Sequence, residues 1–347
     1  MKLAAVNWYG AEEKDFVVAG LDKVALPALA TWIRGAGFNA VRLPYSSEMV
    51  ESNPPIADAM LTANPALKGK TALEVYDAVV AALGSAGVMV ILDNHTSHAD
   101  WCCSGTDGDG LWYTADYPES AWLADWAALA TRYAANKAVI GADLRNEPRD
   151  AAGKSPAWGG ADPSVDWHAA AQRGGNAVLA ANPDLLVFVE GIDYSLDLSG
   201  AGALPIVFAV PDRLVYEPHD YAFDHPGLPD AATLNTALGN KWGYLLTQNQ
   251  PWTAPVWVGE FGTCHGNASC VYDSTGQGLW YHALSEYLLN ADIDWAYWAV
   301  NGTQARGTGR VFGAEETYGV LDTTWTHAAL AQHLASLRSL QPATQGP

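Results

Sequence analysis

Eight short apolar runs recur along the 347-residue chain, separated by segments with helical patterns. Most runs are continuously apolar rather than alternating, as strands buried on both faces of a parallel sheet require. Eight alternations of strand and helix close naturally into a (β/α)8 TIM barrel. We therefore predict one α/β catalytic domain over residues 1–340, followed by a polar tail, 341–347, that we interpret as a linker stub. The predicted strands are 3–9, 39–44, 88–94, 139–146, 185–190, 213–219, 256–261 and 294–300.

Helix signals fall between these runs. Thr71 and Glu74 form a capping box before an apolar stripe, which predicts that a helix begins there. Ser120 is predicted to cap a second helix, in which Trp122 and Trp126 recur at helical spacing. Two further stripes, at 279–288 and 330–337, predict helices late in the chain.

Composition narrows the choice of partners. No apolar run reaches 18 residues, so no membrane span is predicted. The net charge of −20 argues against nucleic acid, an anionic membrane or a polyanionic glycan as partner. Fifteen Trp and fifteen Tyr exceed the needs of a core of this size, and the excess favours carbohydrate weakly, because such rings stack on sugar faces.

Two glutamates carry the chemical prediction. Glu147 and Glu260 each end an apolar run that contains a glycine, although they lie far apart in the sequence. The active site of a TIM barrel lies at the C-terminal ends of its strands, so we expect the two side chains to converge. Paired carboxylates are how glycosidases supply an acid and a nucleophile. The other polar or aromatic residues at predicted strand ends are Arg42, His95, Asn146, His219, Tyr221 and Trp298.

This constellation resembles glycoside hydrolase family 5, the cellulase family of the retaining 4/7 clan, and the resemblance runs from Asn7 to Trp298. All eight active-site positions of that family are matched. The resemblance implies retaining hydrolysis of a neutral β-glycan, with endo-β-1,4-glucanase as the leading interpretation and no cofactor or metal. Arg145 and the loop at 101–104 depart from the family pattern.

The resemblance also implies roles. Glu147 would be the acid/base with a raised pKa, and Glu260 the nucleophile, about 5 Å away, as retention requires. Asn146 would donate to the sugar 2-hydroxyl. His95 and His219 would hold hydroxyls or tune Glu147, Arg42 and Tyr221 would keep Glu260 ionised, and Trp298 would lie under the sugar.

Alternatives remain at this stage. The family member could act on mannan, on a β-1,3- or β-1,6-glycan, or from the chain end, and a non-catalytic carbohydrate-binding barrel is a remote alternative. A metal-dependent hydrolase using His95, His98 and Asp100 is a weak rival. The segment 107–110 is interpreted as a turn rather than a calcium loop. Further sugar platforms are proposed at Trp8, Trp112, Trp158 and Trp242.

Four cysteines lie in two close pairs. The loops after the third and seventh strands should lie on opposite sides of the barrel, so we predict local pairing as Cys264–Cys270 and Cys102–Cys103. Disulfides indicate an oxidising compartment. We therefore expect a secreted monomer whose leader has been removed.

Overall fold

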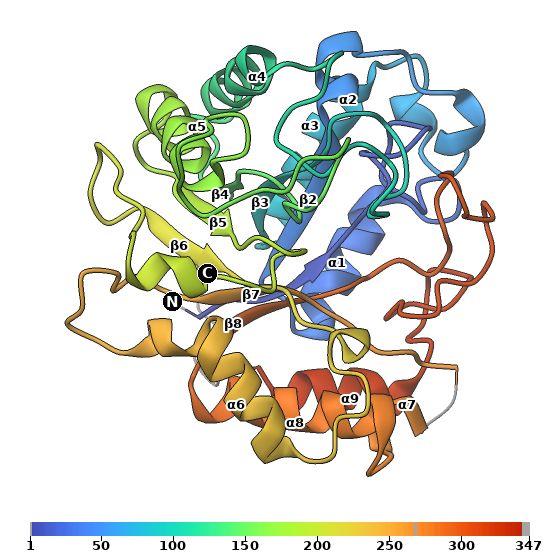
Figure 1. Ribbon diagram of the computed structural model, residues 1–347. Helices are drawn as coiled ribbons and strands as arrows, with labels where there is room; N and C mark the ends of the chain where they lie inside the picture. The colour runs from blue at the N-terminus through green and yellow to red at the C-terminus, as the bar shows by residue number, and fades with distance from the viewer. Residues whose placement is uncertain (1, 267–268, 342–347) are drawn as a thin grey trace.

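The computed structural model describes residues 2–266 and 269–341. Eight strands form one sheet in the order β6-β5-β4-β3-β2-β1-β8-β7, every paired neighbour is parallel, and helices surround the sheet (Figure 1). Single bridges between Tyr216 and Val256 and between His219 and Glu260 join β6 to β7. The predicted (β/α)8 barrel is therefore confirmed. The strands are β1 Ala4–Asn7, β2 Ala40–Ser46, β3 Met89–Thr96, β4 Val139–Asp143, β5 Leu186–Glu190, β6 Leu214–Glu217, β7 Trp257–Phe261 and β8 Asp294–Tyr297.

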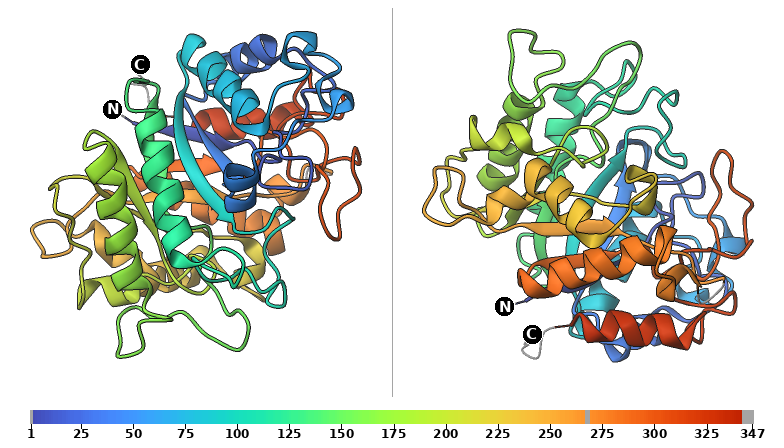
Figure 2. Two further views of the ribbon diagram at one scale, coloured as in Figure 1. Left: turned by 90° about the horizontal axis from the view of Figure 1, so that it is seen from above. Right: turned by 60° about the horizontal axis from the view of Figure 1, so that its bottom comes forward.

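The α-helices form the outer layer, in which α4 packs beside α5 and α6 beside α8 (Figure 2). In α3 the predicted capping box is present, and the Glu74 carboxylate accepts from the Thr71 backbone N–H at 2.9 Å. The cap predicted at Ser120 is wrong, because α4 begins at Glu119 and its N-cap is Pro118. The α-helices are α1 Leu26–Ala36, α2 Ser47–Ser52, α3 Ala72–Ser85, α4 Glu119–Arg132, α5 Trp167–Ala181, α6 Ala231–Lys241, α7 Ser269–Tyr272, α8 Gly276–Asn290 and α9 Ala331–Ser339.

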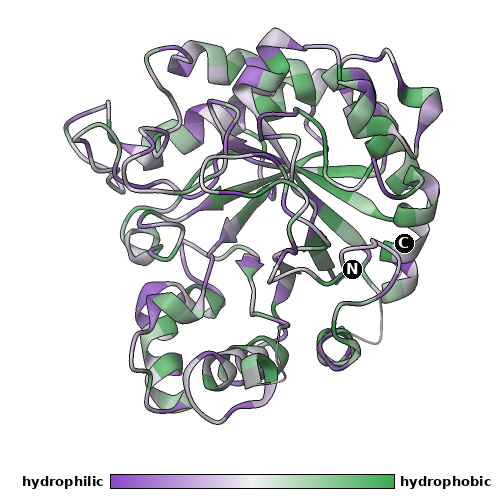
Figure 3. Cartoon of the chain, turned by 90° about the vertical axis from the view of Figure 1, so that its right-hand side faces the viewer, coloured by the Kyte–Doolittle hydropathy of each residue, from purple (hydrophilic) through white to green (hydrophobic). Residues whose placement is uncertain are grey.

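The strands separate two apolar cores. The larger core lies between the sheet and the helices, and strands in Figure 3 are mostly green along their length. A smaller core lies inside the lower part of the barrel, towards the N-terminal ends of the strands. There the Phe188 and Trp257 rings pack edge to face with centroids 4.9 Å apart. Among the described residues, no helix is both long and apolar enough to cross a bilayer.

A charged layer lies directly above this smaller core. Side chains two positions apart on a strand share a face, and five apolar residues of the smaller core are each followed, two positions later, by a polar residue that also points inward. All of these residues are buried. The pairs are Ala5 and Asn7, Ala40 and Arg42, Ile91 and Asp93, Phe188 and Glu190, and Val215 and Glu217.

Two strand glycines make room for these layers. A Cβ on Gly141 would lie 2.3 Å from Phe188 Cε2, and a Cβ on Gly259 would lie 1.7 Å from Glu217 Oε1. Both distances are far below van der Waals contact. The space that a side chain would take at each glycine is therefore occupied by a residue of the neighbouring strand.

This packing predicts that Gly259→Ala destabilises the barrel by about 1–3 kcal/mol, because an overpacked interior must shift side chains and backbone. Urea unfolding of the variant measures the change. Gly35→Ala in α1 is the matched control, since nothing lies within 4 Å of that added Cβ. A Gly259→Ala protein as stable as the unmodified chain would contradict the packing argument.

Candidate active site

Glu147 and Glu260 meet at the C-terminal end of the barrel, as the sequence predicts. Glu260 lies on β7, and Glu147 follows β4. One carboxylate oxygen of each glutamate and a ring nitrogen of His219 all lie within 4.8 Å of one another. The side chains are nearly buried, with 9% and 4% of Glu147 and Glu260 exposed.

Two donors hold the Glu260 carboxylate. Arg42 Nη1 donates to Oε1 at 2.7 Å, and the Tyr221 hydroxyl donates to Oε2 at 2.8 Å. Burial raises the pKa of Glu260 above its usual value, and the Arg42 cation opposes this rise. Hydrogen bonds and an adjacent cation both favour the ionised form of a carboxyl group. The contacts expected for a nucleophile are thus present.

Glu147 has a different environment. Burial raises the pKa of its carboxyl group to about 7, against the opposing effect of Arg149 and Arg42. His219 Nδ1 lies 3.1 Å from Glu147 Oε1. Burial lowers the pKa of His219 to about 3, so this ring is neutral near pH 7 and places no cation beside Glu147.

The backbone of Glu147 is strained, with a φ of 46° in the left-handed region that residues other than glycine seldom adopt. Its N–H donates to Glu190 Oε2 at 2.7 Å, and its carbonyl oxygen accepts from Arg149 Nη1 at 3.0 Å. These two bonds fix the conformation that directs the Glu147 side chain into the site.

Arg42 is the centre of the charged layer. Its side chain is fully buried, and five carboxylates lie within 3.2 Å of the guanidinium, namely Asp93, Asp143, Glu190, Glu217 and Glu260. Burial raises the pKa of Asp93 and Asp143 to about 6, and it raises the pKa of Glu190 and Glu217 well above the usual range. Part of this cluster is therefore protonated at neutral pH.

The site predicted from the sequence lacks Asp93, Asp143, Glu190 and Glu217. A signal was present for two of them, because Glu190 and Glu217 each end an apolar run, as Glu147 and Glu260 do. They join the site because their side chains point into the barrel, and this orientation depends on how the strands close around Arg42.

The remaining predicted residues surround the two glutamates. Asn146 Oδ1 accepts from Arg42 Nη2 at 2.9 Å. His95 Nδ1 lies 2.7 Å from Asp93 Oδ2, and the His95 ring stacks on Trp298 with centroids 5.4 Å apart. Burial lowers the pKa of His95 well below its usual value, so it is also neutral.

A cleft of about 380 Å³ opens above these residues. Trp298 lines it, together with aromatic residues that the sequence analysis did not select, Trp101, Tyr194, Phe223 and Tyr318. Phe223 is 68% exposed and stacks on Tyr221. A second cavity, of about 440 Å³, lies among lower-barrel residues such as Leu3 and Trp257 and contains none of the site residues.

Three of the four additional sugar platforms are corrected by the structure. Trp8, Trp112 and Trp242 are at most 1% exposed, so their ring faces are covered by protein. Trp158 is half-buried, and its indole N–H donates to the Leu204 carbonyl at 2.9 Å. Core and platform tryptophans look alike in a sequence, because both follow or flank apolar segments.

The residues of the rival metal site have separate partners. His95 contacts Asp93, His98 lies 3.1 Å from Asp116, and Asp100 accepts from Thr308. In the segment 107–110, the Asp109 carboxylate accepts from the Ser97 and His98 backbone N–H groups and from Arg145. Protein donors thus bind both carboxylate oxygens of Asp109.

Both predicted cysteine pairs are bonded, Cys102 to Cys103 and Cys264 to Cys270. The first pair lines the cleft. Of the tail at 341–347, only Gln341 lies within the described residues.

A parallel barrel with two close glutamates in an aromatic-lined cleft has the kind of site found in barrel glycosidases. The family model described as Cellulase (glycosyl hydrolase family 5) matches residues 4–304. The chain therefore belongs to glycosyl hydrolase family 5, the cellulase family, and is a glycoside hydrolase.

Individual relatives agree with this assignment. An endoglucanase of Paenibacillus polymyxa is 35% identical over 92% of this chain and 78% of its own length. The major extracellular endoglucanase of Xanthomonas campestris is 31% identical, and the match spans 94% of this chain and 65% of that protein. An endocellulase of Pyrococcus horikoshii, solved in complex with cellotetraose, superposes with a TM-score of 0.83 at 27% identity, covering 99% of this chain and 93% of that one.

The charged layer predicts that the protein loses stability as pH rises. Carboxyl groups with a raised pKa bind protons more tightly in the folded chain than in the unfolded chain, so the free energy of unfolding falls between the unfolded and folded pKa values. For Asp93 and Asp143 this window ends near pH 6, and for Glu147 near pH 7. The buried neutral histidines His95 and His219, whose pKa values are lowered, oppose this trend up to about pH 6.5. Above that pH the loss of protons from Glu190 and Glu217 dominates, so the midpoint of urea unfolding should be lower at about pH 9 than at about pH 7.

A neutral isostere provides the comparison for this measurement. Glu217→Gln removes one buried ionisable group whose pKa is raised, so its unfolding midpoint should depend less on pH. A midpoint that rises from about pH 7 to about pH 9 in the unmodified protein would refute the explanation.

Proposed function

We propose that the protein is an endo-β-1,4-glucanase that hydrolyses its substrate by double displacement with retention of configuration. The observation that carries this proposal is the approach of the Glu147 and Glu260 carboxylate oxygens to within 4.8 Å. Retaining glycosidases place their carboxyl groups about 5–5.5 Å apart, whereas inverting enzymes separate them by about 6.5–9.5 Å to admit a water molecule.

In the first step, a Glu260 oxygen attacks the anomeric carbon and forms a glycosyl-enzyme ester. Glu147 gives its proton to the departing glycosidic oxygen, so the leaving sugar departs as an alcohol. In the second step, Glu147 removes a proton from water, and the resulting hydroxyl attacks the same carbon and releases Glu260. The net change is the addition of one water molecule across the glycosidic bond.

The environments of the glutamates suit these roles. A carboxyl group with a pKa of about 7 retains its proton at mildly acidic pH and can act as the acid. Glu260 is supported as the nucleophile by the donors Arg42 and Tyr221. Asn146, which lines the same cleft as both glutamates, is proposed to donate to the 2-hydroxyl, a contact that strengthens in the transition state.

A neutral glucan is the substrate best supported. The named relatives are endoglucanases, and the Pyrococcus horikoshii protein binds cellotetraose. The net charge of −20 disfavours an anionic polymer. Exposed Phe223 and half-exposed Tyr194 at the cleft offer ring faces to successive sugars.

Substrate screening tests the proposal. Soluble β-1,4-glucan should lose viscosity early and give mixed oligosaccharides, while mannan, β-1,3-glucan and β-1,6-glucan should be cut much more slowly. Release of a single short sugar from the chain end would show that the enzyme is exo-acting rather than endo-acting. Faster cleavage of one of the other glycans would identify a different substrate.

We also propose that the protein acts outside the cell, because it holds two disulfides and a relative is named as extracellular. Since all the site residues come from one chain, a monomer suffices for activity. Light scattering of the purified protein tests the monomer, and a search for the protein in culture medium tests secretion.

The pKa of Glu147 predicts the basic limb of the pH profile. Because the acid must be protonated, kcat/KM should fall as pH rises through about 7. Arg149 lowers the pKa of Glu147, so Arg149→Gln should move this limb to higher pH. Arg173→Gln is the control, since Arg173 pairs with Glu119 on the outer helices. An unmoved limb in Arg149→Gln would contradict the assignment.

Substitution separates the roles of the two glutamates. Glu260→Ala should reduce activity on every substrate by several orders of magnitude, because the nucleophile is lost. Glu147→Ala should cleave polymer very slowly but still attack an activated aryl β-glycoside, whose leaving group needs no proton. Added azide should then accelerate turnover and yield the β-glycosyl azide. The reverse pattern in the two variants would exchange their roles.

A further inference from the structure

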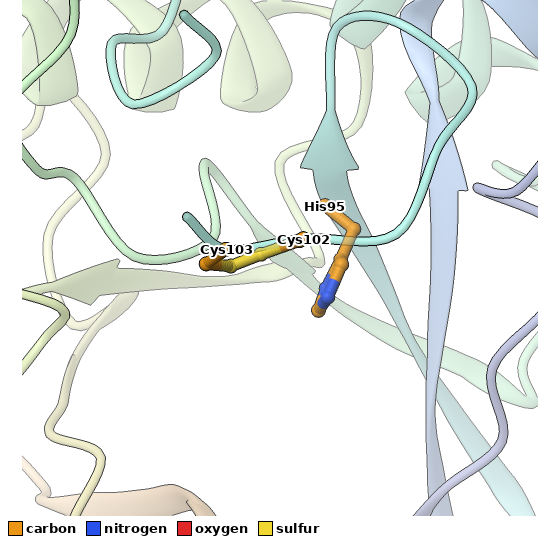
Figure 4. A group of neighbouring side chains, drawn as sticks. All are labelled: His95, Cys102 and Cys103. Carbon is orange, nitrogen blue, oxygen red and sulfur yellow. A yellow bond between two sulfur atoms is a disulfide. The ribbon is translucent and has the colours of Figure 1, made fainter. Parts of the chain in front are cut away.

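The Cys102–Cys103 disulfide lies in the wall of the cleft, beside the residues proposed to contact the scissile sugar. Cys102 is 5% exposed and Cys103 is half-buried, and both line the cleft with Glu147 and Glu260. The two sulfurs and a His95 ring nitrogen lie within 4.8 Å of one another (Figure 4). Bonded to each other, these sulfurs are not thiolates, and the group is therefore no metal site in this state.

The disulfide contacts Asn146 directly. Asn146 Nδ2 donates towards the Cys102 sulfur at 3.3 Å and the Cys103 sulfur at 3.4 Å. On the other side of the amide, Asn146 Oδ1 accepts from Arg42. Arg42 has only donors and the disulfide only acceptors, so the two partners fix the same orientation of the amide.

The loop that carries the disulfide contacts the site segment at two further points. Asp109 pairs with Arg145 at 2.8 Å, one residue before Asn146. Asp107 pairs with Arg149 at 2.7 Å, two residues after Glu147. The loop therefore holds the segment 145–149 at both of its ends, and this segment carries the strained Glu147 backbone.

We propose that the Cys102–Cys103 disulfide is a positioning element of the active site, which holds the Asn146 amide against the 2-hydroxyl of the sugar at the cleavage point. The inference rests on the proposed function and adds a specific group to it. In the reduced state, each sulfur carries an S–H that rotates and donates, and the two side chains separate. The fixed pair of acceptors for Asn146 is then lost.

A double-mutant cycle tests this role, with an aryl β-cellobioside as substrate. Cys102→Ser/Cys103→Ser should lower kcat/KM by roughly 10- to 100-fold, because small displacements of an aligned group cost rates of this order. In the Asn146→Ala background, the same cysteine change should cost less than about threefold, since the amide it positions is absent. Equal losses in both backgrounds would show that the disulfide acts without Asn146 and would overturn the proposal.

Two readouts separate positioning from general damage. The basic limb of the pH profile should stay in place, because the groups that shift the Glu147 pKa remain. The second disulfide provides the matched control. Cys264→Ser/Cys270→Ser should change kcat/KM by the same factor whether residue 146 is Asn or Ala.

Reduction of the folded enzyme tests the same point without substitution at the site. A water-soluble phosphine reduces the disulfide to two thiols, and the phosphine takes the oxygen of one water molecule to become the phosphine oxide. Wild type and Cys264→Ser/Cys270→Ser should both lose activity on reduction and regain it on reoxidation, whereas Cys102→Ser/Cys103→Ser should be unaffected. Thiol counting by mass spectrometry confirms which bond has opened.

The outcomes distinguish this inference from the proposed function. An untreated wild-type protein that cleaves no β-glucoside would refute the proposed function. A wild-type protein that is active, and whose activity is the same after the Cys102–Cys103 bond has been opened, would refute only the positioning role.

Discussion

Five buried carboxylates surround the single guanidinium of Arg42. Charges inside a protein are expensive to bury unless they are paired, and one cation cannot balance five anions. The cluster therefore retains protons near neutral pH, and the retained protons turn acidic side chains into hydrogen-bond donors as well as acceptors. The rest of the site depends on this arrangement, because Arg42 also fixes Glu260 and Asn146.

The same cluster supports the different roles that we propose for two glutamates a few ångströms apart. Glu260 lies against Arg42 and Tyr221, which stabilise its anion, while the carboxyl group of Glu147 lies beside a neutral histidine. Glu190 links the two environments, since one of its oxygens accepts from Arg42 and the other from the Glu147 backbone. The role of each carboxyl group thus follows from its partners rather than from its residue type.

The apolar layer below the charges is equally necessary. It places apolar side chains directly against the charged layer, and low-polarity surroundings strengthen electrostatic interactions. Gly259 has no side chain, and the space is occupied by Glu217 from the neighbouring strand. Substitutions in the layer should therefore affect stability and site geometry together. The loop that holds Cys102 and Cys103 forms a wall of the cleft and contacts both ends of the segment 145–149.

The sequence by itself determined the eight strands, the barrel, and the convergence of Glu147 and Glu260, because each depends on local periodicity and on the rule that active sites lie at the strand ends. It also determined local disulfide pairing, since neither pair needs distant segments. Only the tertiary structure decided which side chains enter the charged layer and which tryptophans face the cleft. Glu190 and Glu217 carry the same local signal as Glu147 and Glu260, but they lie against Arg42 inside the barrel and do not line the cleft. Trp8, Trp112 and Trp242 were assigned to the core, because burial is set by packing between segments that are remote in sequence.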